Sequence, residues 1–419
     1  MKRKIEKTAV FILLFCAAEV FAADVAMPRL AMPTARDSGM GGTHVAYTDN
    51  VFSLLVNPAA MMRVQQRSFF AVSPTLFSPQ STFGLINAIQ GIVSKGDLGA
   101  LGDAASILSK QKGKISMGFE LKEFPLSIAW VADGFGFGLW NRVFVNPNII
   151  GTNYNFDVYA DVILPVGFAF KLLDINGHAV DAGLTVKPFA RIRAHETGNL
   201  MALMDTDTNF VDSMSAPLII GAGFALGLLY RWDIGLSAGL TFDDIVTRGG
   251  VAANLYGSDS NTYFVPFSMN LGLAYDFKLG QIWKSAPGFL AKTGLSFAAD
   301  WRDLTNIFQQ DNYSQRNAVL DLGLGTQLSL GGLFNLRLGL NEMLPAVGMG
   351  FDLGPFELDA AYYGKELGLE PGQLPIAALD LTFAIRPGAK KRNWPWARRA
   401  LSDLIGGNNP ANAESTSAP

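Results

Sequence analysis

"LIIGAGFALGLLYRW", residues 218–232, decides the fold class of this chain. Its even-numbered positions are almost all large and apolar, whereas its odd-numbered positions include three glycines and end in Arg231. Alternation with a period of two is typical of a β-strand whose two faces meet different surroundings. The stretch therefore predicts a strand with one apolar face and one face that is small or polar.

The same alternation recurs over much of the chain. Comparable runs occupy residues 234–242, 265–277, 289–302, 320–330, 334–341 and 379–386. A soluble antiparallel sheet also alternates, but runs of about ten residues match a tilted membrane strand. Aromatic residues gather at the ends of runs, as at Tyr230, Trp232 and Trp301, where a lipid interface favours them. The hydrocarbon core of a membrane holds no water that could bind backbone polar groups. Strands that cross it must therefore pair with one another and close into a barrel. We predict an all-β, transmembrane antiparallel β-barrel over residues 67–387.

The connections between the runs also alternate. Tight connections are predicted at 231–233, 331–332 and 354–355, and long polar ones at 196–216, 245–263, 304–316 and 365–373. Barrels of this kind have short periplasmic turns, long outer loops and an even number of strands. Roughly fifteen runs can be counted, so we expect about fourteen strands, with the ambiguity in 67–172. Residues 85–110 look helical and are assigned to a connection.

The two ends of the chain are expected to lie outside the barrel. Residues 1–23 read as a signal peptide, with Lys2, Arg3 and Lys4 ahead of an apolar run and a small-residue cleavage site before Asp24. The sole cysteine, Cys16, could instead anchor a lipid, although the bulky residue before it disfavours that alternative. Residues 388–419 are predicted to form a periplasmic tail that is partly disordered.

Composition excludes several classes of function. Charged residues make up 16% of the 419 residues and the net charge is −3, which offers no basic stripe for nucleic acid. The three histidines, His44, His178 and His195, lack the spacing of a metal site or a catalytic triad. The match of 235–239 to a hydrolase motif lies within a predicted strand, without the required strand-to-helix turn. We therefore expect no catalytic residues, no metal and no cofactor.

Residues 24–66 precede the first predicted strand and are rich in glycine and other small residues. A barrel of about fourteen strands encloses a lumen that wall side chains alone do not fill. Glycine permits close backbone approach, so this segment is predicted to fold as a hatch inside the lumen. The alternative is a leader exposed to the periplasm.

Residues 35–61, "ARDSGMGGTHVAYTDNVFSLLVNPAAM", resemble the N-terminal signature of the long-chain fatty-acid transporter (FadL) family. The matching positions are Arg36, Gly39, Met40, Gly41, Gly42, Asp49, Asn57, Pro58 and Ala59. The resemblance implies a fourteen-strand barrel blocked by an N-terminal hatch. It also implies that hydrophobic molecules leave sideways through a wall opening at a kinked strand. A related group with the same signature binds exported proteins, and family likeness alone does not choose between these roles.

One strand carries an unusual row of polar side chains on its predicted inner face. The row comprises Lys187, Phe189, Arg191, Arg193 and His195. Arginine pairs with carboxylates through two hydrogen bonds, so the row could hold a carboxylate head group. The alternative is pairing with wall carboxylates on neighbouring strands. Pro165 and Pro188 each predict a kink or bulge, because proline cannot donate to a strand ladder.

These observations favour a monomeric outer-membrane channel, surrounded by membrane lipid, for passive uptake of hydrophobic small molecules. Long-chain fatty acids or related lipids are the expected solutes. The alternative is a barrel without transport activity that binds exported proteins or surface partners. A continuous apolar path into the lumen would favour transport, whereas a lumen crossed by ion pairs would favour the partner role.

Overall fold

The computed structural model describes residues 25–78, 114–116, 118–125, 127–150, 153–199, 215–285, 292–307 and 316–386. The expected signal peptide, the predicted helix over 85–110 and the predicted tail over 388–419 lie outside these ranges. Within them, no helix is both long enough and apolar enough to cross a membrane.

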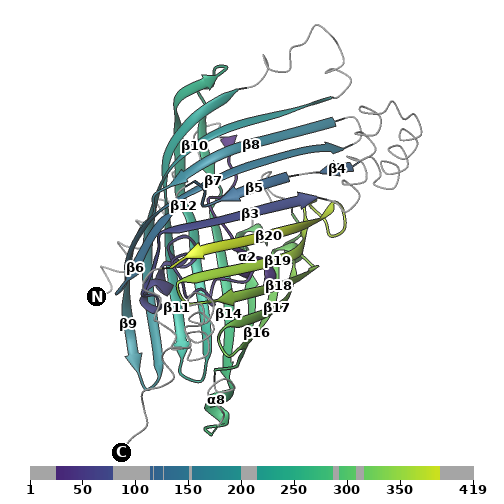
Figure 1. Ribbon diagram of the computed structural model, residues 1–419. Coiled ribbons are helices and arrows are strands. Elements are labelled where there is room, and N and C mark those ends of the chain that lie inside the picture. Colours follow the sequence, from purple (N-terminus) through teal and green to yellow (C-terminus); the bar gives the residue numbers. More distant parts are fainter. Residues whose placement is uncertain are drawn as a thin grey trace, which may run out of the picture.

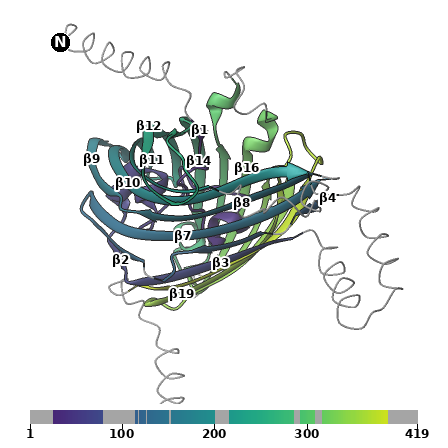
Figure 2. The same ribbon diagram turned by 90° about the horizontal axis from the view of Figure 1, so that it is seen from above.

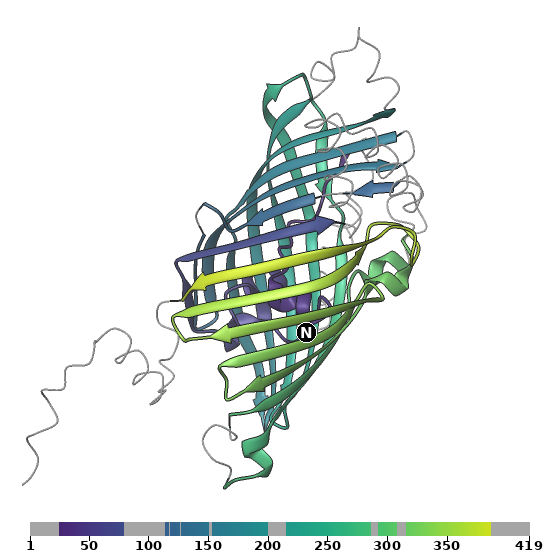
Figure 3. The same cartoon turned by 45° about the vertical axis from the view of Figure 1, so that its right-hand side comes forward.

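The described strands form one closed ring of fourteen antiparallel strands (Figure 1). Ten of them are single elements: β7 (Phe135–Ile150), β10 (His178–Asn199), β11 (Ala216–Trp232), β12 (Leu236–Tyr256), β15 (Gly294–Trp301), β16 (Leu322–Leu330), β17 (Phe334–Asn341), β18 (Leu344–Asp352), β19 (Phe356–Glu366) and β20 (Pro375–Ile385). The other four are interrupted: β2 (Gln66–Ser68) with β3 (Phe70–Ser78); β4 (Lys114–Ser116), β5 (Gly118–Lys122) and β6 (Ile128–Ala132); β8 (Asn153–Ile163) with β9 (Val166–Ile175); and β13 (Thr262–Val265) with β14 (Ser268–Lys278). The ring closes where β20 pairs with β3, seen as the yellow and purple strands side by side in Figure 3. The predicted fold class is confirmed.

The two faces of β11 have the character that its alternation predicts. Ile220, Leu226 and Leu228 are 53%, 42% and 40% exposed on the outside of the ring. Ile219 and Leu229, one residue out of phase, are fully buried inside it. An outward belt of apolar side chains suits hydrocarbon, because the strands of a closed ring pair their backbone groups with one another.

The two ends of the barrel differ in the length of the connections between strands. We call the end with the tight turns at 133–134, 176–177, 233–235, 331–333 and 353–355 the turn end, and the opposite end the loop end. Asp133-Gly134 and Asn176-Gly177 take positive φ angles, as two-residue hairpins require. The predicted long loop over 245–263 is wrong, because β12 continues to Tyr256 and β13 begins at Thr262. Its polar residues belong to strands near the loop end.

The N-terminal segment, residues 25–65, lies inside the ring (Figure 2). It contains the two-residue strand β1 (Val25–Ala26) and three short helices, α2 (Ala35–Gly39), α3 (Ser53–Val56) and η2 (Pro58–Arg63). β1 pairs in parallel with β13, so the segment begins against the loop half of the wall. The remaining short helices, α8 (Leu279–Ile282), η3 (Leu304–Ile307) and η4 (Ala318–Asp321), lie in the connections on either side of β15.

Candidate functional site

Glycines on the inner face of the wall let the N-terminal backbone touch the strands directly. A Cβ added to Gly339 would lie 2.4 Å from the Gly41 nitrogen, and one added to Gly227 would lie 2.2 Å from Asn57 Oδ1. Gly41 itself has a φ of +69°, and a Cβ there would meet the Leu324 carbonyl oxygen at 2.2 Å. There is no room for a side chain between the wall and the segment at these positions. Glycine is therefore required on both surfaces.

Asn57 explains the Asn-Pro-Ala part of the signature. Its Oδ1 accepts a hydrogen bond from the Ala59 nitrogen at 3.1 Å and so caps η2. Its Nδ2 donates to the Val45 carbonyl at 2.8 Å and approaches the Leu228 carbonyl of β11 at 3.4 Å. Pro58 occupies the start of η2, where its missing N–H costs nothing. One side chain thus joins two parts of the segment and the wall.

Arg36 and Asp49 hold the segment together internally. Arg36 donates to Asp49 at 2.6 Å, and its guanidinium lies 4.6 Å from the centre of the Tyr47 ring. Desolvation alone would raise the pKa of Asp49, but the Arg36 guanidinium prevails and holds this pKa below its ordinary value. The pair joins α2 to the chain ten or more residues downstream.

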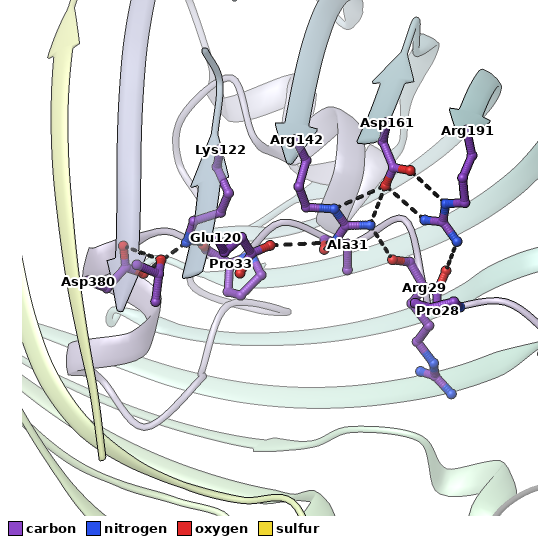
Figure 4. Close-up of polar contacts among 11 residues, drawn as sticks. Pro28, Arg29, Ala31, Pro33, Glu120, Lys122, Arg142, Asp161, Arg191 and Asp380 are labelled. Carbon is purple, nitrogen blue, oxygen red and sulfur yellow. Dashed lines mark hydrogen bonds and ion pairs between the residues drawn. The ribbon is translucent and has the colours of Figure 1, made fainter. Parts of the chain in front are cut away.

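Four cations on the three strands β5, β7 and β10 face the first residues of the segment, and we call them the cation row: Lys122, Arg142, Arg191 and Arg193 (Figure 4 shows the first three). Arg193 donates to the Ala26 carbonyl at 3.1 Å and Arg191 to the Pro28 carbonyl at 2.6 Å. The N-terminal segment is therefore bound here through its main chain.

The other half of the cation row continues the same pattern along the segment (Figure 4). Arg142 donates to the carbonyls of Ala31 at 3.0 Å and Arg29 at 2.8 Å. Lys122 donates to the Pro33 carbonyl at 2.6 Å. The sequence does not single out Lys122 and Arg142, because both lie within 67–172, where the strands cannot be counted unambiguously.

Wall carboxylates pair with every member of the cation row. Asp161 accepts from Arg142 at 2.5 Å and from Arg191 at 2.6 Å, and all three side chains are almost fully buried. Arg193 lies 3.1 Å from Asp157, and Lys122 lies 2.9 Å from Asp380. Their remaining N–H groups point at main-chain carbonyls, so the ion pairs orient the donors.

The other predicted ligand-binding residues of β10 separate from this group. Lys187 lies 3.3 Å from Asp244, and Phe189 is buried among apolar side chains. His195 is 43% exposed, with its Nδ1 3.7 Å from Asp157. The structure thus contains the wall pairing that the sequence offered as the alternative, together with contacts to the N-terminal segment.

An apolar cluster, here called the apolar seam, follows one side of the inner wall. Its wall members are Ala129, Val131, Trp140, Ile163, Phe189, Ile219, Tyr263 and Val265. Its members from the N-terminal segment are Met27, Leu30, Met32, Val51, Phe52, Leu54, Leu55, Met61 and Val64. β13 supplies it near the loop end and β6 near the turn end, so the seam spans most of the wall height.

The wall is irregular beside the seam, between β5 and β6. Lys122 pairs with Arg142 and Ile128 with Leu139, so the described residues 123–125 and 127 have only residues 140 and 141 of β7 opposite them. On the other side, Ser127 Oγ accepts from the Ala71 nitrogen at 2.9 Å in place of a backbone carbonyl. Phe124 projects outward and is 45% exposed. Nothing in the alternation of the sequence marked this interruption.

The two predicted kinks lie opposite each other but differ. Pro165 separates β8 from β9, whereas β10 runs through Pro188 without a break. The wall stays paired here, because the Leu164 nitrogen donates to the Pro188 carbonyl at 2.9 Å and the Gly138 nitrogen donates to the Pro165 carbonyl at 3.0 Å. The described residues contain no group of three or more His, Cys, Asp or Glu that could hold a metal.

Comparison with known proteins gives only structural matches. No family model matches the chain, and no curated protein matches it. The chain is similar to the P. putida toluene transporter TodX at 12% identity, covering 85% of this chain and 99% of that one, with a TM-score of 0.46. It is similar to the Ralstonia pickettii toluene transporter TbuX at 11% identity, with coverages of 85% and 98% and a TM-score of 0.45. It is similar to a Pseudomonas aeruginosa FadL homologue at 13% identity, with coverages of 87% of this chain and 99% of that one and a TM-score of 0.45. At these identities and TM-scores the matches carry no conclusion about function.

Proposed function

We propose that this chain is an outer-membrane channel for the passive uptake of hydrophobic small molecules, with long-chain fatty acids or related lipids as solutes. The observation that carries the proposal is the apolar seam. Most of the inner wall presents glycine or ion pairs, whereas the seam offers continuous apolar contact from β13 to β6. Ligand sites in proteins are mostly apolar with a few polar groups, and the seam with the adjoining cation row has that composition.

The N-terminal segment acts as the hatch in this proposal. Its side chains, among them Met27, Met32 and Leu54, occupy the seam and would have to move aside for a solute. Methionine is flexible and polarizable, so it can yield to ligands of varied shape at modest cost. Solute enters near Tyr263 and Val265 at the loop end and replaces these side chains step by step.

The interruption at 123–127 is the proposed exit. The seam reaches it through Trp140, which is 1% exposed and lies 6.0 Å from Phe52 between ring centres. Side chains replace part of the backbone ladder here, so opening would break fewer main-chain hydrogen bonds than elsewhere in the wall. Solute would leave sideways into the membrane.

Trp140→Ala is the sharpest test, measured as uptake of a labelled long-chain fatty acid and of a neutral apolar probe of similar length. The cells used should lack other uptake routes for these compounds. We expect severalfold faster uptake of both probes than with the wild type, because the change widens the seam at its exit. Phe77→Ala is the matched control, since Phe77 is a buried inner-face aromatic outside the seam.

Uptake that is equal with wild type, with Trp140→Ala and without the protein would refute transport. Deletion of residues 37–61 is expected to make the barrel leaky to small polar molecules as well, because it removes the glycine-packed part of the hatch. A preference for the fatty acid over the neutral probe would assign a role to the cation row in head-group recognition.

A second candidate, a barrel that binds exported or surface proteins, is favoured by one observation. Buried ion pairs such as Arg142–Asp161, Lys187–Asp244 and Arg337–Asp359 occupy much of the inner face. Absence of uptake together with retained binding of a secreted protein would select this function.

A further inference from the structure

A short repeat lies in the part of the N-terminal segment that the cation row binds. Residues 26–33 contain Ala-Met-Pro twice, as Ala26-Met27-Pro28 and Ala31-Met32-Pro33. In each unit one cation binds the alanine carbonyl and another binds the proline carbonyl: Arg193 and Arg191 in the first, Arg142 and Lys122 in the second. In each unit the methionine is buried, at 3% and 2% exposure. The wall thus contains two equivalent subsites, each for one tripeptide.

The chemistry of the repeat suits recognition through the main chain. Proline has no N–H, so a unit brings one fewer backbone donor that burial would leave unpaired. Proline also keeps the preceding methionine extended, which places the carbonyls on either side of it within reach of the wall. The cations are held by Asp157, Asp161 and Asp380, so their free N–H groups are already aimed before a peptide arrives.

Residues 25–33, here called the strap, are bound in a way that permits release. Apart from the cation row and the packing of Met27, Leu30 and Met32 in the apolar seam, the strap is held by the short β1–β13 pairing and by Arg29. Arg29 lies 2.5 Å from Asp303 and is 34% exposed. Unlike Gly41 or Asn57, none of its residues is packed against a wall glycine. A cavity of about 370 Å³ borders Met27, Pro28 and Arg29, so displacement can begin at the first unit.

From these contacts we infer that the cation row and the adjoining apolar pockets form a binding site for extended, proline-containing peptides of the Ala-Met-Pro type. The strap occupies this site in cis and so blocks it. The ligand class is set by carbonyls at both ends of each unit, an unbranched apolar side chain between them, and proline in place of a backbone donor. The inference does not depend on solute transport.

The test uses the full chain with Met27→Lys and Met32→Lys, because two ammonium groups buried beside the four cations of the cation row should expel the strap. Release is read by maleimide labelling after Leu30→Cys is added, because Leu30 is 1% exposed while the strap is bound. Cys16 lies in the predicted signal peptide, so a processed chain would carry this one thiol. Folding of each variant is checked by resistance of the barrel to unfolding in cold SDS.

The probe is a fluorescent peptide with the sequence of residues 24–34, measured by anisotropy. We expect it to bind the strap variant at least tenfold more tightly than the wild-type chain, whose own strap competes. A control peptide with methionine and proline exchanged in both units should bind at least tenfold more weakly. Arg193→Gln in the strap variant should weaken peptide binding about tenfold, since a hydrogen bond from a charged donor contributes about 1.5–3 kcal/mol.

Three outcomes would overturn the inference. The first is a strap that stays protected from maleimide despite both lysines. The second is a variant whose barrel is folded and whose strap is released, but whose cation row and apolar pockets do not bind the peptide. The third is equal binding of the two peptides, which would show that the apolar lumen takes up any peptide of this composition.

Discussion

The wall binds the two halves of the N-terminal segment by opposite means. From Gly39 to Ala59, the backbone packs directly onto glycines of β10, β11, β12, β14, β16, β17 and β18. From Ala26 to Pro33, it is held at a distance by long cationic side chains of β5, β7 and β10. At the glycine contacts the backbone of the segment lies directly against the backbone of the wall, because glycine has no side chain. These contacts contain no flexible side chain that could release the segment one hydrogen bond at a time. Contacts through long side chains can break one at a time, so the first half is the part suited to release.

The largest effect is expected on the charged side, from Asp161→Asn. The change leaves Arg142 and Arg191 buried without their shared carboxylate. Removing one partner of a buried ion pair costs about 3–5 kcal/mol, and this should appear in the free energy of unfolding measured with urea in lipid vesicles. Asp174→Asn is the control, because its pair with Lys171 is exposed and should contribute nothing measurable. Equal effects of the two changes would show that the charged side does not hold the segment.

A smaller loss of stability, with a clear functional readout, is expected on the glycine side from Gly339→Val. The new side chain would collide with the backbone of Met40 and Gly41. Overpacking of this kind costs about 1–3 kcal/mol, and the displaced segment should raise single-channel conductance in planar bilayers. Gly250→Val is the control, because a Cβ at Gly250 meets no atom within 4 Å. Unchanged conductance of Gly339→Val would contradict the close packing.

Asn57→Ala tests the joint between the glycine-packed backbone and the wall. The change removes the η2 cap and the hydrogen bond to the Val45 carbonyl. We expect a loss of about 1–2 kcal/mol in the free energy of unfolding, since lost caps and buried hydrogen bonds are worth this much. The exposed Asn153→Ala should leave the unfolding free energy unchanged. An equal loss of unfolding free energy in Asn153→Ala would show that the hydrogen bonds of Asn57 do not account for the effect of Asn57→Ala.

The smallest effect is expected from Asp49→Asn, which breaks a pair inside the segment rather than one with the wall. Asp49 is 51% exposed at its side chain, so solvent screening limits its contribution to below about 1 kcal/mol. Its folded pKa lies below the ordinary value, so the stabilisation is present at neutral pH and disappears as pH falls through the folded pKa. The unfolding midpoints of wild type and variant should therefore converge in acid. A difference that persists or grows there would contradict the assignment.

Much of the barrel could be predicted from local pattern, and part of the inner face could not. The alternation in 218–232 predicts both faces of β11, and the tight turn at 331–332 is where the sequence indicates it. The turn predicted at 231–233 lies at 233–235 instead, because Arg231 and Trp232 still belong to β11. The loop predicted over 245–263 is instead mostly strand, because paired strands can extend beyond the membrane with polar residues on both faces. The break at 123–127 leaves no trace in periodicity, because it depends on how many residues the neighbouring strand supplies.

The candidate site divides along the same line. Arg191 and Arg193 stand out in the sequence because charges on a membrane strand must face inward, but Lys122, Arg142 and Asp161 acquire their importance only through their neighbours. The repeat Ala-Met-Pro can be read directly from the sequence. That cations bind both of its units can be seen only in the structure, because the four donors are far from the repeat along the chain.

By itself, the sequence determined that strands with an apolar outer face close into a ring and that the chain before them is compact and rich in glycine. Both follow from local chemistry, since side-chain period and backbone freedom are properties of neighbouring residues. Only the tertiary structure decided which wall glycine meets which backbone atom and which cation meets which carbonyl. Those contacts join residues 163 and 167 positions apart, as in Arg191–Pro28 and Arg193–Ala26, and closure of the ring sets their distance.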